Sequence, residues 1–333
     1  MRVAIIGAGL IGNKRAASIS KSKGCSVVAV ADVNFERAQE LAQRFGGDSY
    51  QSWDPIGERD DVDVVVIATI NKFLAEIALF FLGKGKHVLA EKPLGRNARE
   101  ARSIVEAAKK YNVKVKTGFN HRHHPGIAKG RQIMAEGHIG EISFLRCRYG
   151  HGGRPGYDRE WRADKDLCGG GELLDQGVHV VDLFRWFAGD FQEVFGYLPT
   201  CFWNMQVEDN AFALFKTHKG QIASMHTSWT QWKNLFSFEV FGHDGYVIVE
   251  GLGGSYGPER LKVGRRKAEG GAPEETIIDF PQEDISWEEE WKEFLQAIEE
   301  NREPLGSGWD GYQANRMLDA VYESARAGRP VNL

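Results

Sequence analysis

The sequence predicts an α/β protein of two domains, in which a doubly wound parallel sheet is followed by an α/β domain with a large, mostly antiparallel, open sheet. Three observations predict it. A β-branched run at residues 2–6 enters a glycine turn and a helix; apolar strands then alternate with helices up to residue 120; and closely spaced aromatic strands come after it. We therefore expect one domain at residues 1–120 and a second at residues 121–333.

The composition fits two folded domains and argues against several classes of function. A chain of 333 residues with 42% hydrophobic and 11% aromatic residues can bury two cores. The formal net charge is -4, so the overall charge favours neither nucleic acid nor a membrane surface as a partner. The four cysteines form no Cys-x-x-Cys pair, and no segment resembles a signal peptide or a membrane span, which predicts a cytoplasmic protein without a disulfide scaffold.

The turn GAGLIG, which begins at Gly7, has the spacing of a dinucleotide-binding site. Gly7 allows the tight turn, Gly9 lets a pyrophosphate approach the main chain, and Gly12 lets the next helix pack on the strand. The first amides of that helix, at Leu10 and Ile11, are expected to face the phosphates. This strand, turn and helix predict a Rossmann domain.

The second strand, CSVVAVAD, ends at Asp32, twenty positions after Gly12. A carboxylate at this point accepts hydrogen bonds from the adenosine ribose hydroxyls and repels the extra phosphate of NADP. NAD is therefore the predicted cofactor. Arg37 leaves NADP as an alternative, because a nearby guanidinium can accommodate that phosphate.

Polar side chains also end two later strands of the first domain. Thr69 and Asn71 follow the strand DVVVIA, and Glu91 and Lys92 follow the strand HVLA. Ligands of such sheets lie beyond the carboxyl ends of the strands, so these residues are expected at the cofactor. Lys92 can hydrogen-bond a substrate hydroxyl and help to move its proton. The alternative is an ordinary surface lysine.

The stretch GGGELLDQGVHVVDLFRWFAGD, residues 169–190, combines a glycine-rich approach with a helical apolar pattern. In a helix, Asp175 and His179 are four positions apart and share one face, which makes them candidates for acid/base chemistry. Gly189 lies where a helix C-cap is expected. The alternative is a buried helix whose aspartate and histidine only satisfy each other.

Three histidines, His121, His123 and His124, follow the first domain. A metal site is disfavoured, because adjacent side chains point apart and no carboxylate or cysteine lies at ligand spacing. We expect no metal here and instead hydrogen bonds to ligand or backbone. The long glycine-rich loop that precedes residue 169 carries Trp161 and Arg162, and loops of that length are usually functional.

The rest of the second domain predicts an open sheet that needs a partner. Strands are expected near residues 141–149, 191–199, 210–217, 221–230, 235–241 and 245–250, with short turns that favour antiparallel pairing, and two closing helices near 286–300 and 310–327. Aromatic residues are frequent in these strands. Self-association would cover the second face of the sheet, so we predict a homodimer or homotetramer.

Six motifs occur in one order through both predicted domains. They are GAGLIG, AD at 31–32, AEKPLGRN at 90–97, GFNHRHHP at 118–125, WRAD at 161–164 and GGGELLDQGVHVVDLFRW at 169–186. In these motifs the sequence resembles the Gfo/Idh/MocA family of NAD(P)-dependent sugar and inositol oxidoreductases. EKP together with the Asp-x-x-x-His helix is the specific part.

The resemblance implies a role for each of the site residues. Lys92 would be the lysine of EKP, His179 the acid/base, and Asp175 its neighbour on the substrate. Four further residues would lie near the cofactor and the sugar: Trp161, Arg162, Asn120 and Arg122. One segment, TINKFL, departs from the family pattern, with Ile70 and Leu74 where relatives often carry proline and histidine.

Residues and resemblance together predict reversible hydride transfer between nicotinamide and a secondary alcohol or ketone carbon of a sugar or sugar nucleotide. In this reaction His179 would take the hydroxyl proton and Lys92 would polarise or relay it. Two alternatives stay open: an inositol or other polyol dehydrogenase with the same catalytic residues, and a non-catalytic NAD(P)-binding sensor of the same fold.

Overall fold

The computed structural model describes residues 1–280 and 283–333, which form two compact units. Unit 1 contains Met1–Asn120 and Trp287–Asn315, and unit 2 contains His121–Ser286 and Arg316–Leu333. The units meet in the chain at residue 120, where the sequence predicted the boundary. Residues 287–315, however, were expected in the second domain. They belong to unit 1 because Trp291 and Phe294 are buried in its core.

Within the described residues, unit 1 is built on six parallel strands in the order β3-β2-β1-β4-β5-β6, with helices between them. Its elements are β1 (Arg2–Ile6), α1 (Leu10–Ser20), β2 (Ser26–Ala31), α2 (Phe35–Phe45), β3 (Asp48–Tyr50), β4 (Val64–Ile67), α3 (Asn71–Gly83), β5 (His87–Ala90), α4 (Ala98–Tyr111) and β6 (Val115–Thr117), followed later in the chain by α8 (Ser286–Glu299) and the start of α9 (Gly308–Ala327). The chain order reverses between β1 and β4, which is where such sheets bind their ligands.

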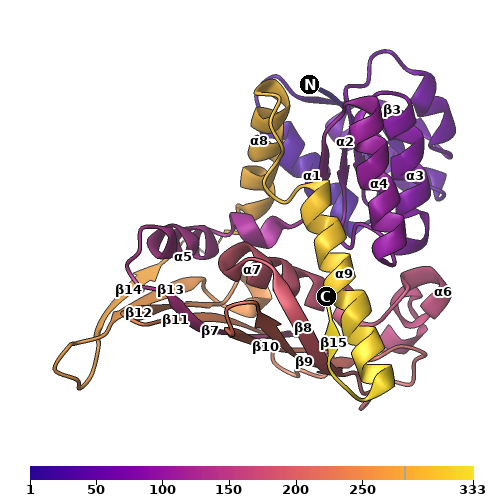
Figure 1. Ribbon diagram of the computed structural model, residues 1–333. Coiled ribbons are helices and arrows are strands. Elements are labelled where there is room, and N and C mark those ends of the chain that lie inside the picture. Colours follow the sequence, from indigo (N-terminus) through magenta and orange to yellow (C-terminus); the bar gives the residue numbers. More distant parts are fainter. Residues whose placement is uncertain (281–282) are drawn as a thin grey trace. The chain divides into compact units, whose positions relative to one another are not determined.

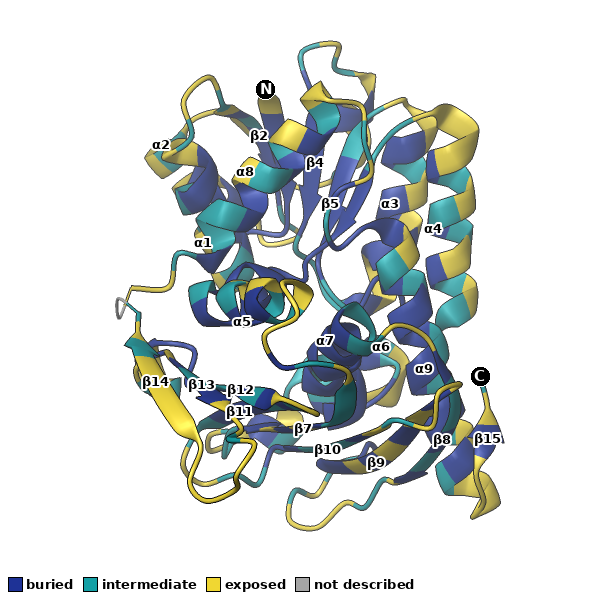
Figure 2. Cartoon of the chain, turned by 60° about the vertical axis from the view of Figure 1, so that its left-hand side comes forward, coloured by how far each residue is buried: buried dark blue, intermediate teal, exposed yellow. Residues whose placement is uncertain are grey.

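The sheet of unit 1 buries both of its faces, because successive side chains of a strand point to opposite sides. Val3 and Ile5 pack with α1, α2 and α8 on one face. Ala4 and Ile6 pack with α3 and α4 on the other. Figure 2 shows β4 buried throughout and β5 mostly buried, while α3 and α4 alternate between buried and exposed residues. Because helices bury both faces of the sheet, its strands consist of continuous apolar runs.

Unit 2 is built on nine strands among its described residues, in the order β14-β13-β12-β11-β7-β10-β9-β8-β15. Every pairing is antiparallel except that of β7 with β10. The elements, labelled in Figure 1, are α5 (Pro125–Ala135), β7 (Ile142–Gly150), α6 (Lys165–Cys168), α7 (Val178–Ala188), β8 (Phe191–Tyr197), β9 (Asn210–Thr217), β10 (Ile222–Ser228), β11 (Leu235–Gly242), β12 (Gly245–Glu250), β13 (Arg260–Arg265), β14 (Glu274–Asp279) and β15 (Val331–Asn332).

The predicted fold class is confirmed, and the strands expected between residues 141 and 250 form at nearly the expected positions. Helix α5 and the three strands β13, β14 and β15 were not predicted from the sequence. Helix α5 packs on β12 and β13, and α7 packs on β7, so both cover the same sheet. Among residues 1–280 and 283–333, every helix is too short or too polar to cross a bilayer.

Candidate active site

The glycine turn after β1 is crowded at Gly7 and Gly12 but has open space at Gly9. Gly7 has φ +101, and a Cβ there would lie 2.5 Å from the carbonyl oxygen of Ala68, while a Cβ at Gly12 would lie 1.9 Å from the carbonyl oxygen of Gly7. A Cβ at Gly9, in contrast, would meet no atom within 4 Å. The open side therefore lies at the start of α1, at Leu10, where free backbone amides favour a phosphate.

Asp32, directly after β2, is held by two main-chain amides. Its Oδ2 accepts a hydrogen bond from Ala8 N at 2.7 Å, and its Oδ1 accepts one from Asn34 N at 2.8 Å. The carboxylate is half-buried, and each oxygen can accept a further hydrogen bond from a ribose hydroxyl. Arg37 lies exposed in the first turn of α2. The turn and the carboxylate fit a dinucleotide.

The strand-end residues lie at the same edge of the sheet as the glycine turn, because β1, β4 and β5 are neighbours in parallel register. Thr69 lies between β4 and α3, and Asn71, which is 7% exposed, begins α3. Glu91 and Lys92 follow β5, and the Lys92–Pro93 peptide is cis. In the segment that departs from the family pattern, Leu74 is fully buried in the core.

Residues 169–190 do not form the single α-helix that the sequence predicts. After α6 and three glycines, a π-helical turn spans Leu173–Gly177, and α7 begins at Val178. The backbone is crowded at Gly171, where a Cβ would lie 2.0 Å from the carbonyl oxygen of Glu208. Short π-helical turns often mark functional sites, because they change the angle at which side chains leave a helix. Gly189 caps α7 as predicted.

Asp175 lies in this π-helical turn, and His179 lies in the first turn of α7. Asp175 Oδ2 is 3.4 Å from Arg162 Nε, so the long loop contributes its arginine to the carboxylate. Burial acts to lower the pKa of Arg162, but the charges of Asp175 and of its other neighbours outweigh it and raise that pKa. His179 is 5% exposed. The predicted residues Asp175 and Arg162 are therefore brought together.

The ring of His179 lies edge-on to the ring of His121, with 3.8 Å between the ring centroids. His121 also stacks on Phe236 at 5.7 Å and meets Tyr149 edge-on at 5.2 Å. One of the three clustered histidines is therefore part of the surroundings of His179. No three histidine, cysteine, aspartate or glutamate side chains within residues 1–280 and 283–333 gather as metal ligands.

Two tyrosines in this region were missed by the sequence analysis. Gln176 Nε2 donates a hydrogen bond to the Tyr256 hydroxyl at 3.1 Å, and the ring of Tyr256 lies 5.4 Å from that of Tyr149. Burial is the main cause that raises the pKa of Tyr256 to about 12, and it raises the pKa of Tyr149 well above its ordinary value. Both phenols therefore keep their protons at neutral pH. The glycines around Tyr256 were the only signal in the sequence.

Arg122, which was predicted to lie near the sugar, forms a buried ion pair with Asp182. It is 3% exposed, and it donates hydrogen bonds from Nε to Asp182 Oδ2 at 2.8 Å and from Nη2 to Asp182 Oδ1 at 2.6 Å. Its guanidinium also lies over the ring of Trp186, at 5.3 Å from the centroid. These contacts tie Arg122 to α7, and its place near the sugar stays a prediction. Asn120 is 7% exposed and begins a 3-10 turn.

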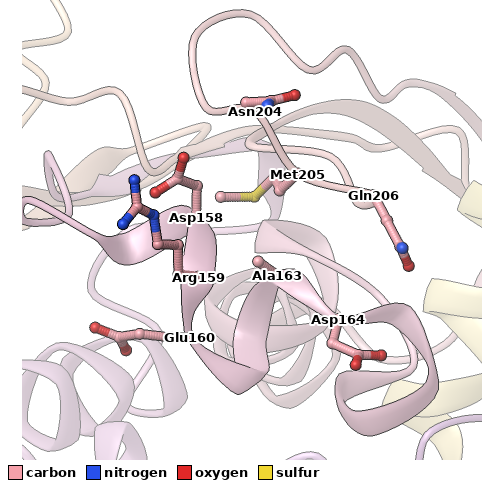
Figure 3. A pocket seen from close by; sticks show the side chains of 8 residues that line it. All are labelled: Asp158, Arg159, Glu160, Ala163, Asp164, Asn204, Met205 and Gln206. Carbon is pink, nitrogen blue, oxygen red and sulfur yellow. The ribbon is translucent and has the colours of Figure 1, made fainter.

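The loop that carries Trp161 and Arg162 also lines a pocket of about 370 Å³ (Figure 3). Trp161 itself packs against a cluster of Tyr157, Cys168, Val207 and Trp229. The pocket is mostly polar, and neither Asp175 nor His179 lines it. Its residues are Asp158, Arg159, Glu160, Ala163, Asp164, Asn204, Met205 and Gln206.

Comparison with known proteins agrees with this architecture. Residues 1–119 match the model of the oxidoreductase family with an NAD-binding Rossmann fold, and residues 127–248 match the GFO/IDH/MocA C-terminal domain. A dTDP-3,4-didehydro-2,6-dideoxy-alpha-D-glucose 3-reductase from Actinomadura kijaniata is 31% identical over 226 residues, which cover 68% of this chain and 67% of that protein.

Two further comparisons extend over nearly the whole chain. The levoglucosan dehydrogenase of Pseudarthrobacter phenanthrenivorans is 29% identical, with 89% of this chain and 86% of that protein covered. The solved structure of a levoglucosan dehydrogenase in complex with NADH is 26% identical with a TM-score of 0.92, and the alignment covers 100% of this chain and 98% of that one. The predicted NAD-binding domain is thus confirmed, and the chain belongs to the Gfo/Idh/MocA family of NAD-binding oxidoreductases.

Proposed function

We propose that the protein transfers a hydride, reversibly, between NAD and a secondary alcohol or ketone carbon of a sugar or sugar nucleotide. The observation that carries the proposal is the pair of Asp175 and His179, which stand on a π-helical turn and the helix that follows it, with Arg162 beside the carboxylate. Similarity to dehydrogenases and reductases of sugars supports the substrate class.

In the direction of oxidation, the substrate C–H bond breaks and its electron pair leaves with the hydrogen, while the hydroxyl proton is removed. NAD, when bound, supplies the acceptor for that hydride. His179 would accept the proton, Lys92 would donate a hydrogen bond to the oxygen as negative charge develops on it, and Asp175 would hold the hydroxyl and favour the protonated imidazole. The mechanism requires that Lys92 and His179 act on the same substrate hydroxyl.

Replacement of either basic group tests this mechanism. Lys92→Ala and His179→Ala should each lower kcat by about 10²- to 10⁴-fold, since positioned acid/base groups contribute that much, and should leave the Kd of NADH nearly unchanged. His138→Ala is a matched control, because His138 is exposed on the surface of unit 2. Rates of both variants near the rate of the original protein would refute the assignment.

The substrate class can be tested with a panel of carbohydrates. The protein is incubated with NAD and levoglucosan, glucose 6-phosphate, a methyl glucoside or myo-inositol, and formation of reduced nicotinamide is followed by its absorbance. Turnover of a sugar supports the proposal, and preference for inositol supports the polyol alternative. NADH binding without turnover of any carbohydrate would favour the non-catalytic sensor.

We further propose that the protein is a cytoplasmic homodimer or homotetramer that associates through the open face of the unit 2 sheet. Large apolar side chains are exposed on β8, β9 and β10, on the face that α7 does not cover. They are Tyr197 at 63%, Phe212 at 42%, Leu214 at 50% and Ile222 at 40% exposure. A patch of this kind on neighbouring strands is typical of an interface between subunits.

A further inference from the structure

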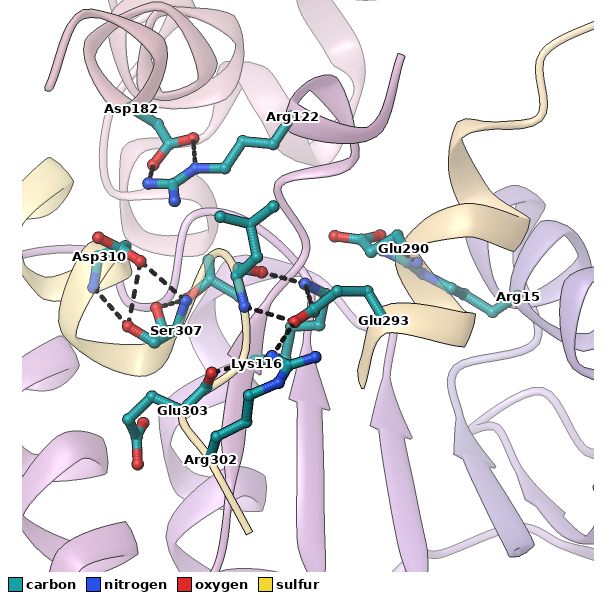
Figure 4. A network of polar contacts seen from close by, with 12 residues as sticks. Arg15, Lys116, Arg122, Asp182, Glu290, Glu293, Arg302, Glu303, Ser307 and Asp310 are labelled. Carbon is teal, nitrogen blue, oxygen red and sulfur yellow. Dashed lines mark hydrogen bonds and ion pairs between the residues drawn. The ribbon is translucent and has the colours of Figure 1, made fainter. Parts of the chain in front are cut away.

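Arg15, in the second turn of α1, is a buried arginine with two carboxylate partners in unit 1. Its Nε donates to Glu91 Oε1 at 2.7 Å, and its Nη1 donates to Glu290 Oε2 at 2.5 Å. The side chains of Arg15, Glu91 and Glu290 are 1%, 9% and 0% exposed. Figure 4 shows Arg15 reaching Glu290 on α8. The guanidinium is thus held between two segments that are distant in the sequence.

Stability alone is a weak reason for such a triad. Removing charged groups from water costs free energy that their mutual attraction often only offsets, and apolar residues of similar volume can replace them without loss of stability. The residues around the triad nevertheless pack closely against it. A Cβ at Gly118 would lie 2.9 Å from both Arg15 Nη2 and Glu91 Oε2, and the ring of Trp287 lies 4.5 Å from the guanidinium.

The position of Glu91 suggests what the triad does. Glu91 directly precedes Lys92, and its main-chain N donates to Ile67 O at 2.9 Å. With its side chain held by Arg15 as well, Glu91 is fixed on both sides of its Cα. The Cα of Lys92 is one planar peptide away, so the anchoring of Glu91 restrains the origin of the lysine side chain. Arg15 belongs to the helix that starts in the glycine turn.

We propose that Arg15 and Glu290 are positioning residues for hydride transfer. Arg15 ties the segment of Lys92 to the helix at the dinucleotide turn, and Glu290, from the C-terminal part of the chain, holds Arg15 in the orientation that this requires. Both act on the reaction through Glu91 and Lys92. The inference rests on the role of Lys92 in the proposed function.

The test compares two carboxylates on one helix. Glu290→Gln removes a charged partner of Arg15. Glu293→Gln, one turn further along α8, removes a charged partner of the buried Lys116, whose Nζ lies 3.0 Å from Glu293 Oε2. With NAD and whichever sugar of the panel is turned over, Glu290→Gln should lower kcat by about 10- to 100-fold, because a misplacement of about 1 Å can cost that much. Its Kd for NADH, measured by fluorescence titration, should change by less than about threefold.

Glu293→Gln should lower the thermal midpoint and leave kcat within about twofold of the original value. In Glu290→Gln the primary deuterium isotope effect on kcat, measured with sugar labelled at the reacting carbon, should increase, since hydride transfer becomes slower relative to product release. Equal losses of thermal midpoint in the two variants, with kcat unchanged in both, would overturn the proposal and leave the triad as a structural feature.

A double variant separates this inference from the proposed function. If Glu290 acts through Lys92, then Lys92→Ala/Glu290→Gln should lose no more rate than Lys92→Ala alone, because residues that act as a unit are not additive. A further loss of rate would overturn the inference. Full activity of Lys92→Ala would instead refute the proposed function.

A readout without turnover guards against variants that fold poorly. Arg15→Lys keeps the charge but loses the fork that contacts both carboxylates. Crystal structures of Arg15→Lys and of the original protein, superposed on the unit 1 sheet, should show Lys92 Nζ displaced or poorly ordered in the variant. An unchanged Lys92 in a folded Arg15→Lys protein would contradict the positioning role.

Discussion

At the scale of single residues, the setting of a carboxylate decides its function. Asp32 and Asp182 both accept hydrogen bonds at both carboxylate oxygens. Asp32 accepts hydrogen bonds from neutral main-chain amides and is half-buried at the edge of the sheet. It can therefore still accept hydrogen bonds from a ligand. Asp182 is 2% exposed and neutralises Arg122. The first therefore suits cofactor recognition, and the second suits the architecture of the helix.

Replacing Asp32 should change the choice of cofactor. In Asp32→Ser the preference for NADH over NADPH, expressed as the ratio of their Kd values, should fall by about 10- to 100-fold, because a charge-assisted hydrogen bond is lost and the repulsion of the extra phosphate disappears. Fluorescence titration with each cofactor measures it. Glu36→Ser, an exposed carboxylate in the first turn of α2, is the control. An unchanged ratio would contradict the role of Asp32.

At the scale of elements, α7 is held by Arg122, which lies before this helix in the chain and pairs with Asp182. Asp182→Asn removes the carboxylate that pairs with the buried Arg122, so it should lower the free energy of unfolding by about 3–5 kcal/mol. Arg122→Met/Asp182→Leu, which removes both charges, should recover most of that loss. Chemical denaturation measures both variants. A double variant as unstable as Asp182→Asn would show that the pair has a further structural function.

The turn before β9 depends on one carboxylate. Asp209 accepts hydrogen bonds from the main-chain N of Cys201 at 2.7 Å, of Phe202 at 2.8 Å and of Trp203 at 2.9 Å. Burial acts to raise the pKa of Asp209, but these hydrogen bonds and one from Asn210 outweigh it, so its pKa is lowered. The charged carboxylate therefore stabilises the folded state.

This lowered pKa predicts how stability depends on pH. The contribution of Asp209 is fully present above its pKa in the unfolded chain, about 3.9, and is lost as pH falls through the lower pKa of the folded protein. Asp209→Asn should be less stable by about 1.5–3 kcal/mol at pH 7, and the difference from the original protein should shrink toward pH 3. Urea unfolding at several pH values tests it.

The control for this experiment is Asp190→Asn, a carboxylate whose side chain is 69% exposed and pairs with Arg185. An exposed ion pair contributes about 0–1 kcal/mol, so this variant should differ little from the original protein. A loss of stability in Asp209→Asn that is the same at every pH would contradict the role of the charge.

At the scale of the whole molecule, association should depend on the open sheet face of unit 2. Phe212→Glu/Leu214→Glu places two charges on the exposed side of β9 and should convert the oligomer to a monomer of 37.3 kDa. Light scattering after size-exclusion chromatography measures the mass. Leu79→Glu, at an exposed leucine of α3, is the control and should keep the mass of the original protein. An original protein that is monomeric at micromolar concentration would refute the proposal.

Much of the fold could be predicted because its signals are local. The alternation of apolar strands and helices, the glycine turn and the antiparallel strands from β7 to β12 all follow from spacing within a few residues. The hairpin of β13 and β14 was missed because both strands carry many charges and β14 is largely exposed, as Figure 2 shows. Helix α5 was missed because its apolar pattern is weak.

The sequence by itself determined the architecture of each unit and the set of residues with chemical potential, including Asp32, Lys92, Asp175 and His179. Only the tertiary structure decided how they are held. The pairing of Arg122 with Asp182 and the triad of Arg15 depend on contacts between residues 60 to 275 positions apart. Local propensity does not encode such contacts, because they form only when packing brings distant segments together and burial makes each charge require a partner.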